Sequence, residues 1–378
     1  MGTRIGVIGG GQLARMMIPA AVNLGIELHV LAEQPGMSAA LAASSVGDYH
    51  DLQTVLDFAD TVDVVTFDHE HVPEQILRAL VSRGVAVHPG PDALLYAQDK
   101  LVMRARLTEL GLPVPDWARV ENADELGVFL ADHHGRAVVK TARGGYDGKG
   151  VRVVSHQHEA DDWFAVLAED ANGGALLVEE LVDFRRELAQ VVARRPSGDM
   201  VAWPVVETVQ RDGVCAEVFA PAPHAGDRLI EVAADIARRV AEGIGATGVL
   251  AVELFETTDD RILINELAMR PHNSGHWSID GSVTSQFEQH LRAVLDLPLG
   301  STATRDPWSV MINVLGGPAS GAMSDRYAEA LAQHPSVKVH NYNKVSRPGR
   351  KVGHVTAGGD ELDEVTYQAR AAAAFFQD

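Results

Sequence analysis

Short apolar segments alternate with amphipathic helical segments along residues 1–96. The apolar stretch Arg4–Ile8 is predicted to be a strand. The amphipathic stretch Gln12–Leu24 is predicted to be a helix, because Gly25 follows it and glycine commonly ends helices in the left-handed conformation. We expect a second helix over residues 73–82, followed by Gly84, and further strands over residues 27–31, 63–67 and 85–87. Strands and helices in this order predict a parallel sheet with helices on its faces, as in Rossmann-like domains.

The pattern changes after residue 96. A chain of 378 residues suits two or three domains. The fold class that we predict is α/β, in part α+β, with divisions at residues 1–96, 97–300 and 301–378. We expect helices over about 99–110 and 284–295, a strand, glycine-rich loop and strand over 136–154, two strands around a Thr-Thr-Asp-Asp turn over 248–266, a basic loop over 347–354 and a last Ala-rich helix.

The first glycine-rich loop follows the first strand. Gly9, Gly11 and Ala14 match the G-x-G-x-x-G/A pattern, and Glu33 lies at the end of the next strand, where a ribose-binding acid would lie. In this pattern the backbone approaches a pyrophosphate closely and a helix N-terminus faces the anion. One interpretation is therefore an NAD-dependent oxidoreductase. The other is a tight turn between strand and helix that binds no dinucleotide.

A second glycine-rich loop, residues 141–150, begins directly after Lys140. Such a loop can close its backbone N–H groups over a polyphosphate, and Arg143 and Lys149 add positive charge. It is not a Walker A loop, because G-x-x-x-x-G-K-[ST] is absent. An ordinary hairpin turn is the alternative, although one or two glycines would be enough for that. The four glycines are Gly144, Gly145, Gly148 and Gly150.

Two carboxylates lie on the predicted hairpin over residues 248–266. If the Thr-Thr-Asp-Asp turn centres this hairpin, Glu253 lies opposite Ile264, and Glu266 is its diagonal neighbour on the same face. Two carboxylates in this arrangement are suited to one or two Mg²⁺ ions, which take oxygen ligands and leave sites for phosphates. A solvated charged face is the alternative. It fits poorly, because the flanking residues are strongly apolar and buried carboxylates need partners.

The charge and cysteine content exclude several classes of protein. The net charge of −20 argues against a general binder of nucleic acid or of anionic membranes, because the phosphate-neutralising charges are missing. The single cysteine, Cys215, excludes a disulfide framework and is consistent with a reducing cytosol. No apolar run is long enough to span a bilayer, and the first residues do not have the pattern of a signal peptide.

Six segments together resemble one family over nearly the whole chain: the ATP-grasp ligases known as N5-carboxyaminoimidazole ribonucleotide synthetases. Glycine-rich flaps occur in many ATP-grasp ligases, whereas the combination of RPHNSGH with RPGRKVGHV is far more specific to this family. The segments are GGGQLARM at 9–16, KTARGGYDGKG at 140–150, EELVDFRREL at 179–188, NELAMRPHNSGH at 265–276, SQFEQHLRA at 285–293 and RPGRKVGHV at 347–355.

The resemblance implies a Rossmann-like pre-ATP-grasp domain (1–96), an ATP-grasp domain (97–300) with a small lid lobe at about 117–182, and a C-terminal segment (301–378) that completes the substrate site. It also implies that Glu253 and Glu266 ligate Mg²⁺. A histidine is frequent in this family where Gln210 stands, which puts that contact in doubt. The implied ATP-binding residues are Lys100, Lys140, Gly145, Tyr146, Asp147, Gly148, Lys149, Gly150, Glu179, Glu180, Leu181, Val182, Glu187, Gln210, Asn265 and Glu266.

The reacting groups follow from the same resemblance. Arg270, His272 and Asn273 would hold the anionic intermediate, with Lys149 of the flap as a fourth catalytic residue. No role is assigned to His276 or His354. The residues expected to contact the ribonucleotide are Tyr146, Asp147, Glu70, Lys344, Arg350 and Lys351, of which the last three would bind its 5′-phosphate.

The implied enzyme is a carbon–nitrogen ligase of de novo purine (IMP) synthesis. ATP phosphorylates bicarbonate to carboxyphosphate, and the amine of 5-aminoimidazole ribonucleotide then takes the carboxyl group. Further expectations are a cytoplasmic homodimer that passes its product to a mutase. The NAD-dependent dehydrogenase stays as the alternative, on the first glycine loop alone. A nucleotide sensor without activity is a third possibility, which the intact carboxylates and cations disfavour.

Overall fold

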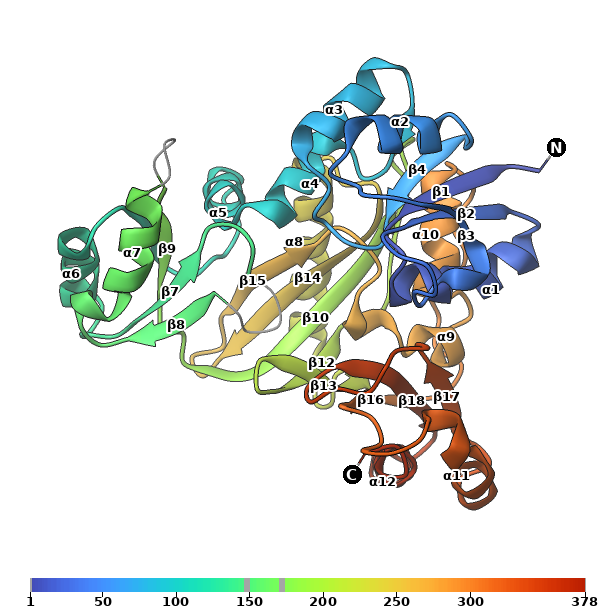
Figure 1. Ribbon diagram of the computed structural model, residues 1–378. Coiled ribbons are helices and arrows are strands. Elements are labelled where there is room, and N and C mark those ends of the chain that lie inside the picture. Colours follow the sequence, from blue (N-terminus) through green and yellow to red (C-terminus); the bar gives the residue numbers. More distant parts are fainter. Residues whose placement is uncertain (1, 146–149, 170–173, 378) are drawn as a thin grey trace.

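A computed structural model describes residues 2–145, 150–169 and 174–377 (Figure 1). The strands within these residues form three sheets. Figure 1 shows the small sheet on one side of the large central sheet and the N-terminal sheet on the other. No helix among the described residues is both long enough and apolar enough to cross a membrane.

The N-terminal sheet is parallel throughout, in the order β3-β2-β1-β4-β5. Helix α1 has its buried residues at helical spacing and ends at Gly25, whose φ is 67°. It covers one face of the sheet together with α10, and α2 and α3 cover the other. This confirms the predicted parallel sheet. The elements are β1 (Arg4–Ile8), α1 (Gln12–Leu24), β2 (Glu27–Ala32), η1 (Ala40–Ala42), β3 (Ala43–Val46), α2 (Leu52–Ala59), β4 (Val64–Phe67), α3 (Glu74–Ser82) and β5 (Ala86–Val87).

The small sheet is antiparallel, in the order β6-β9-β7-β8, and α6 and α7 pack on it. Helices α4 and α5 connect it to the N-terminal sheet. Asp99 caps α5 by accepting hydrogen bonds from the N–H groups of Leu101 and Val102. The elements are α4 (Pro91–Gln98), α5 (Lys100–Glu109), β6 (Trp117–Val120), α6 (Ala123–Asp132), β7 (Ala137–Thr141), β8 (Val151–Val154), η2 (Gln157–Ala160), α7 (Asp161–Ala168) and β9 (Leu176–Glu180).

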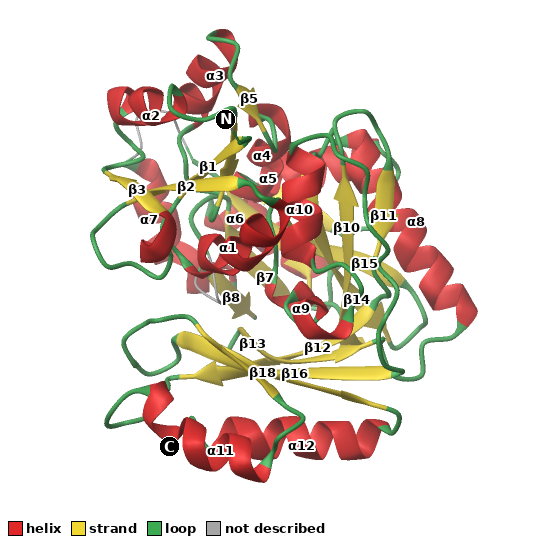
Figure 2. Ribbon diagram, turned by 90° about the vertical axis from the view of Figure 1, so that its right-hand side faces the viewer, coloured by secondary structure: helices red, strands yellow, loops and turns green. Residues whose placement is uncertain are grey.

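The large sheet is antiparallel and runs β15-β14-β10-β12-β13-β16-β18-β17, with β11 beside β10. Helix α8 packs on one face near β10 and β14, and α12 covers the part made by β16 and β18 (Figure 2). The elements are β10 (Phe184–Arg194), β11 (Met200–Ala202), β12 (Val206–Arg211), β13 (Val214–Ala220), α8 (Asp227–Gly243), β14 (Gly248–Thr257), β15 (Ile262–Ala268), η3 (Asn273–Gly275), α9 (Ser278–Gly281), α10 (Gln286–Val294), β16 (Trp308–Leu315), η4 (Met323–Arg326), α11 (Tyr327–Gln333), β17 (Lys338–Asn341), β18 (Lys351–Gly359) and α12 (Leu362–Ala374).

The basic segment 347–354 was expected to be a loop, and this is wrong for its second half. Lys351 is the first residue of β18, which pairs with β16 and β17. The apolar residues after Lys351 pack beneath α12, so burial favours a strand there. Arg350 is still in the loop, directly before the strand.

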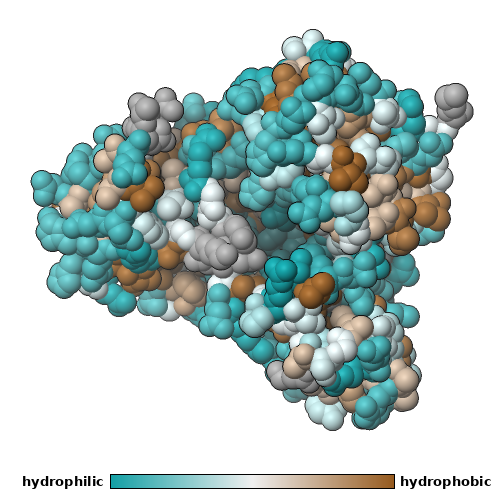
Figure 3. All heavy atoms as spheres, viewed as in Figure 1, coloured by the Kyte–Doolittle hydropathy of each residue, from teal (hydrophilic) through white to brown (hydrophobic). Residues whose placement is uncertain are grey.

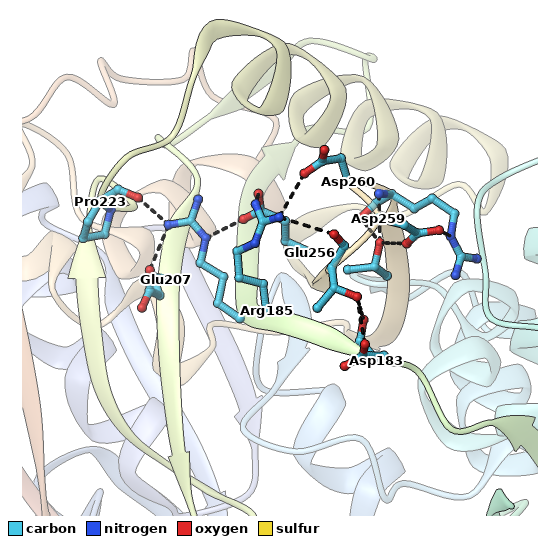
Figure 4. A network of polar contacts seen from close by, with 11 residues as sticks. Asp183, Arg185, Glu207, Pro223, Glu256, Asp259 and Asp260 are labelled. Carbon is cyan, nitrogen blue, oxygen red and sulfur yellow. Dashed lines mark hydrogen bonds and ion pairs between the residues drawn. The ribbon is translucent and has the colours of Figure 1, made fainter.

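A polar network braces the start of β10 (Figure 4). Arg186 bonds Glu256 at 2.5 Å and Glu207 at 3.0 Å, and its guanidinium also donates to the carbonyl of Pro223. Arg185 reaches Glu256 at 3.4 Å. Neighbouring residues of a strand point to opposite faces, so Arg186 and its partners lie on the face away from Glu187. Arg185 lies in the bulge of β10 between Phe184 and Arg186. The contacts of Arg186 therefore fix the strand that carries Glu187 without occupying the same face.

Candidate active site

One cleft of about 1440 Å³ is lined by residues of the small and the large sheet and by the segments that follow β1 and β4 of the N-terminal sheet. It is visible as a hollow between the lobes in Figure 3, with many hydrophilic residues around it. The predicted residues that line it are Glu70, Lys100, Lys140, Gly145, Glu179, Glu180, Leu181, Val182, Glu187, Gln210, Glu253, Asn265, Glu266, Arg270, His272, Asn273, Lys344, Arg350 and Lys351.

Five predicted residues of the flap are not placed in this cleft. Tyr146, Asp147, Gly148 and Lys149 lie outside the described residues. Gly150 is described but does not line the cleft. Its φ is 73°, and a Cβ there would lie 2.4 Å from Thr141 Oγ1, so the end of the flap requires glycine.

The carboxylate pair differs from the predicted arrangement. Glu253 lies directly opposite Glu266, because a bulge places Asn265 as an extra residue between Ile264 and Glu266. The prediction that Glu253 faces Ile264 is therefore wrong. Glu187 of the neighbouring strand β10 shares the same face, since its partner on β14 is two residues from Glu253. Three carboxylates thus line adjacent strands of the large sheet.

The two facing carboxylates have different electrostatic surroundings. Burial, together with the charges of Glu266 and Glu187, raises the pKa of Glu253 to about 7. Burial also acts to raise the pKa of Glu266, but Lys100 and Lys140 outweigh it and lower that pKa. Lys100 Nζ lies 2.6 Å from Glu266 Oε1. Burial raises the pKa of Glu187 to about 7.

These donors are suited to a divalent cation that shares its ligands with a phosphate. Among the residues that the structure describes, no three His, Cys, Asp or Glu side chains form a group that would hold a metal by themselves. Glu253 and Glu266 supply hard carboxylate oxygens on facing strands. Mg²⁺ is commonly held by one or two carboxylates together with substrate phosphates. Burial and the charges of Glu266 and Glu187 raise the pKa of Glu253, and a bound cation would offset both effects.

A second charged cluster joins the small sheet to the large one. Glu179 of β9 is 3 % exposed and bonds Lys140 Nζ at 2.7 Å, and its other oxygen accepts from Arg104 Nε. Burial acts to raise the pKa of Glu179, but the charges of Arg104 and Lys140 hold it below its usual value. Lys140 and Arg104 also bond the side chain and the carbonyl of Asn265, at 3.2 and 2.6 Å. Arg104 therefore links the bulge of β15 to strand β9.

The segment after β15 is held from the opposite wall. Glu70 accepts from Arg270 Nε at 2.8 Å and from the Met269 N–H at 2.9 Å. Glu70 thus orients Arg270, and a contact between Glu70 and the substrate amine stays a prediction. Among the described residues, the buried Oδ1 of Asn273 has no hydrogen-bond partner, which leaves it available to a ligand.

His272 is neutral in this environment. Burial, with the charges of Arg270 and Lys351, lowers its pKa to about 3. Its Nδ1 accepts from the Ser274 N–H, so its proton lies on Nε2, which is 3.3 Å from Glu253 Oε1. His272 therefore presents an N–H donor to the floor of the cleft.

The basic residues of the C-terminal part reach the cleft near the first glycine loop. Lys344 Nζ bonds Gln12 Oε1 at 2.5 Å, at the start of α1. Arg350 donates to the carbonyl of Val345 at 3.2 Å. Arg347 also lines the cleft, although the prediction had named only three cations of this region.

The remaining predicted residues form the side of the cleft near β9 and β12. Glu180 accepts from the Asp116 N–H at 3.1 Å, and Leu181 is 36 % exposed. Phe184 and Phe255 stack with their ring centroids 4.7 Å apart, and both line the cleft. Gln210 of β12 lies where the register with β13 shifts, because Ala216 is an extra residue of β13. An apolar slot beside a polar edge is suited to a nucleotide base.

The first glycine loop has its anion-binding groups occupied by the chain itself. Asp68 accepts from the Ala14 N–H at 2.8 Å, and a Cβ on Gly11 would lie 2.0 Å from Asp68 Oδ2. Burial raises the pKa of Asp68. Glu33 accepts from the Gly10 N–H at 3.0 Å and lies 3.5 Å from His69. The groups that would bind a pyrophosphate and a ribose are therefore engaged, which argues against the dinucleotide interpretation.

Sequence reasoning missed Arg104, Asp68, Gln12 and Arg347. Arg104 had a usable signal, because it follows Lys100 by four residues in a predicted helix and so shares its face. Asp68 had none, since its role depends on the packing of β4 against α1. The structure places His276 and His354 in the core, with 0 % of each exposed.

Comparison with known proteins gives the same arrangement of units. Three family models match: the ribonucleotide synthetase preATP-grasp domain over residues 1–98, the ATP-grasp domain over 105–287, and the phosphoribosylaminoimidazole carboxylase C-terminal domain over 309–368. The N5-carboxyaminoimidazole ribonucleotide synthase of Mycobacterium tuberculosis is 51 % identical over 98 % of this chain and 86 % of its own. That of Corynebacterium ammoniagenes is 48 % identical over 98 % and 91 %.

Solved structures agree with the sequence relatives. The N5-carboxyaminoimidazole ribonucleotide synthetase of Thermus thermophilus has a TM-score of 0.88, with 36 % identity over 99 % of both chains. The Aspergillus clavatus enzyme, in complex with ADP and 5-aminoimidazole ribonucleotide, has a TM-score of 0.88, with 30 % identity over 99 % of this chain and 98 % of that one. The fold, the cleft and these relatives together show that the chain is an ATP-grasp ligase and belongs to the N5-carboxyaminoimidazole ribonucleotide synthase family.

Proposed function

We propose that this chain carboxylates 5-aminoimidazole ribonucleotide with bicarbonate in an ATP-dependent reaction of de novo purine synthesis. The products are N5-carboxyaminoimidazole ribonucleotide, ADP and phosphate. The observation that carries the proposal is that one cleft holds the facing carboxylates, the Lys100 and Lys140 cations and the Arg270–His272 segment. The complex of the Aspergillus clavatus relative with ADP and the ribonucleotide supports the choice of ligands.

The nucleotide would lie between the small and the large sheet. Lys100 and Lys140 would contact its phosphates, and the base would lie against the apolar slot beside Leu181 and Val182. Glu253 and Glu266 would hold Mg²⁺, which neutralises phosphate charge during transfer when it is bound. Glu187 would contact the ribose. The flap residues Tyr146, Asp147, Gly148 and Lys149 are proposed to close over the phosphates and to touch the ribonucleotide.

Carboxylation would proceed in two steps. A bicarbonate oxygen attacks the γ-phosphorus of ATP, the bond to the β-phosphate oxygen breaks, and ADP leaves. The exocyclic amine of the ribonucleotide then attacks the carboxyl carbon of carboxyphosphate, inorganic phosphate leaves with the bridging oxygen, and the amine loses a proton. Positioning and charge stabilisation supply most of the catalysis in such transfers.

The anionic intermediate needs donors and protection from water. Arg270, held by Glu70, offers a fixed cation. His272 offers a neutral N–H donor. Asn273 lines the same cleft, and we propose that its Nδ2 donates to the intermediate while its unpartnered Oδ1 accepts from another group of the ligands. The 5′-phosphate of the ribonucleotide would bind Lys344, Arg350 and Lys351. Lys344 bonds Gln12 at the start of α1, which supports a phosphate site on the N-terminal side of the cleft.

We also propose the domain division 1–96, 97–300 and 301–378, with a lid lobe at about 117–182. The small sheet spans residues within that lobe, and the family models match similar ranges. We further propose a cytoplasmic homodimer whose product passes to a mutase. Light scattering on the purified protein tests the dimer, and a monomeric mass at micromolar concentration would contradict it.

Bicarbonate labelled with heavy oxygen tests the reaction. If bicarbonate is phosphorylated, one of its oxygens departs with phosphate, so inorganic phosphate should carry the label when ATP, Mg²⁺ and the ribonucleotide are present. The phosphate must be analysed early, because bicarbonate exchanges oxygen with water through CO₂. Phosphate that forms without label above the water background would show that carboxyphosphate is not the intermediate.

A further inference from the structure

The side-chain amide of Gln286 holds the backbone of His272 at two points. Gln286 Oε1 accepts from the His272 N–H at 2.9 Å, and Gln286 Nε2 donates to the His272 carbonyl at 2.8 Å. The second hydrogen of the same amide goes to His276 Nδ1 at 2.8 Å. Gln286 is the first residue of α10 and is fully buried. Both of its amide hydrogens are therefore used within the protein.

The surroundings leave this amide little freedom to move. The backbone N–H of Gln286 donates to Ser278 Oγ at 2.9 Å. The amide also lies flat against Gly275, where a Cβ would come within 2.4 Å of Gln286 Oε1. Displacing the amide would leave buried polar groups without hydrogen-bond partners, which is unfavourable, so this arrangement resists displacement.

His272 is in turn fixed at its ring. Ser274 contacts Nδ1, and Nε2 faces Glu253 Oε1 at 3.3 Å. The ring contacts set how the imidazole is turned, whereas Gln286 sets where its backbone lies. Displacing that backbone would move the Nε2–H donor relative to Glu253 and Arg270.

We propose that Gln286 is a positioning residue for carboxylation, which holds His272 so that its Nε2–H donor faces the reacting groups in the cleft. The inference rests on the proposed function. It adds that the segment 270–273 is placed by a clamp from α10, outside the cleft. Without the clamp, water should hydrolyse more of the carboxyphosphate before the amine attacks it. The attack of the amine depends on how His272 is placed, whereas the transfer of the phosphoryl group uses other residues.

The same helix carries a matched control. Gln289 is also fully buried, and it clamps the backbone of Gly300 in the same two-point way, with bonds of 2.6 and 2.8 Å. Gly300 does not line the cleft. Gln286→Met and Gln289→Met therefore each remove a two-point clamp from one helix, and only the first touches a residue of the candidate site. Gln286→Met also removes the bond to His276.

The experiment measures kcat, the KM for ATP, and the ratio of ADP formed to carboxylated ribonucleotide in the whole protein with ATP, bicarbonate and 5-aminoimidazole ribonucleotide present. For Gln286→Met we expect kcat for the carboxylated product to fall on the order of 10- to 100-fold, as displaced catalytic groups usually cost. The KM for ATP should stay within about twofold, and the ADP-to-product ratio should rise above one. Gln289→Met should keep the wild-type kcat and ratio, with a similar loss of thermal stability.

Two conservative variants complete the test. Gln286→Glu keeps an oxygen that accepts from the His272 N–H. The ADP-to-product ratio of this variant should therefore lie between those of the wild type and Gln286→Met. If the methionine variant does not fold, Gln286→Glu is compared with Gln289→Glu instead. The inference is overturned if the variants at position 286 have the same ADP-to-product ratio as the variants at position 289. A wild-type protein that forms ADP but no carboxylated product would overturn the proposed function instead.

Discussion

Glu253 and Glu266 face one another across β14 and β15 with unequal charge compensation. Glu266 has the Lys100 ammonium at 2.6 Å, whereas the neutral ring of His272 lies beside Glu253. The pKa of Glu253 is raised to about 7, while that of Glu266 is lowered. Glu266 is therefore the carboxylate that stays charged, and the pair as a whole favours an additional cation.

Glu266→Gln keeps the shape of the side chain and removes one negative charge from the proposed Mg²⁺ site. We expect turnover to fall on the order of 100-fold or more, because charge stabilisation of phosphoryl transfer is lost. Steady-state kinetics at saturating Mg²⁺ measure it. Glu256→Gln is the matched control, since Glu256 lies on β14 facing Arg186, away from the cleft. It should reduce stability and leave turnover nearly intact. Wild-type turnover in Glu266→Gln would remove this residue from the site.

Arg104→Met tests the buried cluster around Glu179. Arg104 is 0 % exposed, and removing one partner of a buried ion pair typically costs about 3–5 kcal/mol. The variant should be destabilised by that order in urea unfolding, with a higher KM for ATP because Asn265 and Lys140 shift. Adding Glu179→Gln should cost less stability than it does in the wild type, since in Arg104→Met the Glu179 carboxylate has lost one of its two cationic partners and keeps only Lys140. Strictly additive losses in the double variant would show that the two residues do not interact.

At the level of elements, local sequence signals predicted α1 to its last residue, because its apolar spacing and Gly25 act within one segment. Glu253 and Glu266 were correctly predicted to lie on one face of the hairpin. The predicted register was wrong, because it did not include the bulge at Asn265. That bulge depends on contacts from distant parts of the chain. Arg104 bonds the Asn265 carbonyl, and the Ile264 N–H donates to the Pro113 carbonyl.

Elements without a strong local signal were not predicted at all. Helix α2, helix α4 and strand β3 had no counterpart in the sequence reasoning. Strand β3 has the sequence Ala-Ser-Ser-Val and no buried residue, so its order depends on its pairing with β2. Most of the predicted site residues come from the segments that carry the family resemblance, and the structure places many of them along one cleft. Arg104 and Gln286 act through tertiary contacts, which no such segment reveals.

The basic segment before β18 gives a prediction at the same scale. Arg350→Ala and Lys351→Ala should each raise the KM for the ribonucleotide by about tenfold or more, since hydrogen bonds to charged groups contribute about 1.5–3 kcal/mol. The KM for ATP should change little. Lys338→Ala is the control, because Lys338 is exposed on β17 and does not line the cleft. An equal rise in the KM for ATP would place this segment at the nucleotide.

At the scale of the whole molecule, helix α10 joins the N-terminal sheet to the large sheet. Phe287, Leu291 and Val294 pack into the core of the N-terminal sheet. Between them, His290 bonds Thr66 of β4 at 2.7 Å, and its Nδ1 accepts from the Val249 N–H of β14 at 3.0 Å. The two sheets are therefore held together by a histidine whose role requires the neutral form.

The stability of the protein should consequently depend on pH through His290. Burial, with the charge of His88, lowers the pKa of His290 to about 3, so on acidification the unfolded chain binds a proton that the folded chain does not. The contribution of His290 to the free energy of unfolding is fully present above about pH 6.5 and is lost as the pH falls toward 3. Between pH 7 and pH 5 the free energy of unfolding should fall by about 2 kcal/mol through this group.

Urea unfolding between pH 7 and pH 5 measures how the free energy of unfolding changes with pH. His290→Gln should reduce proton uptake on unfolding at pH 5 by about one. Thr66→Val, which removes the partner but keeps the histidine, should lower stability and keep the wild-type slope. An unchanged slope in His290→Gln would show that another group causes the acid sensitivity.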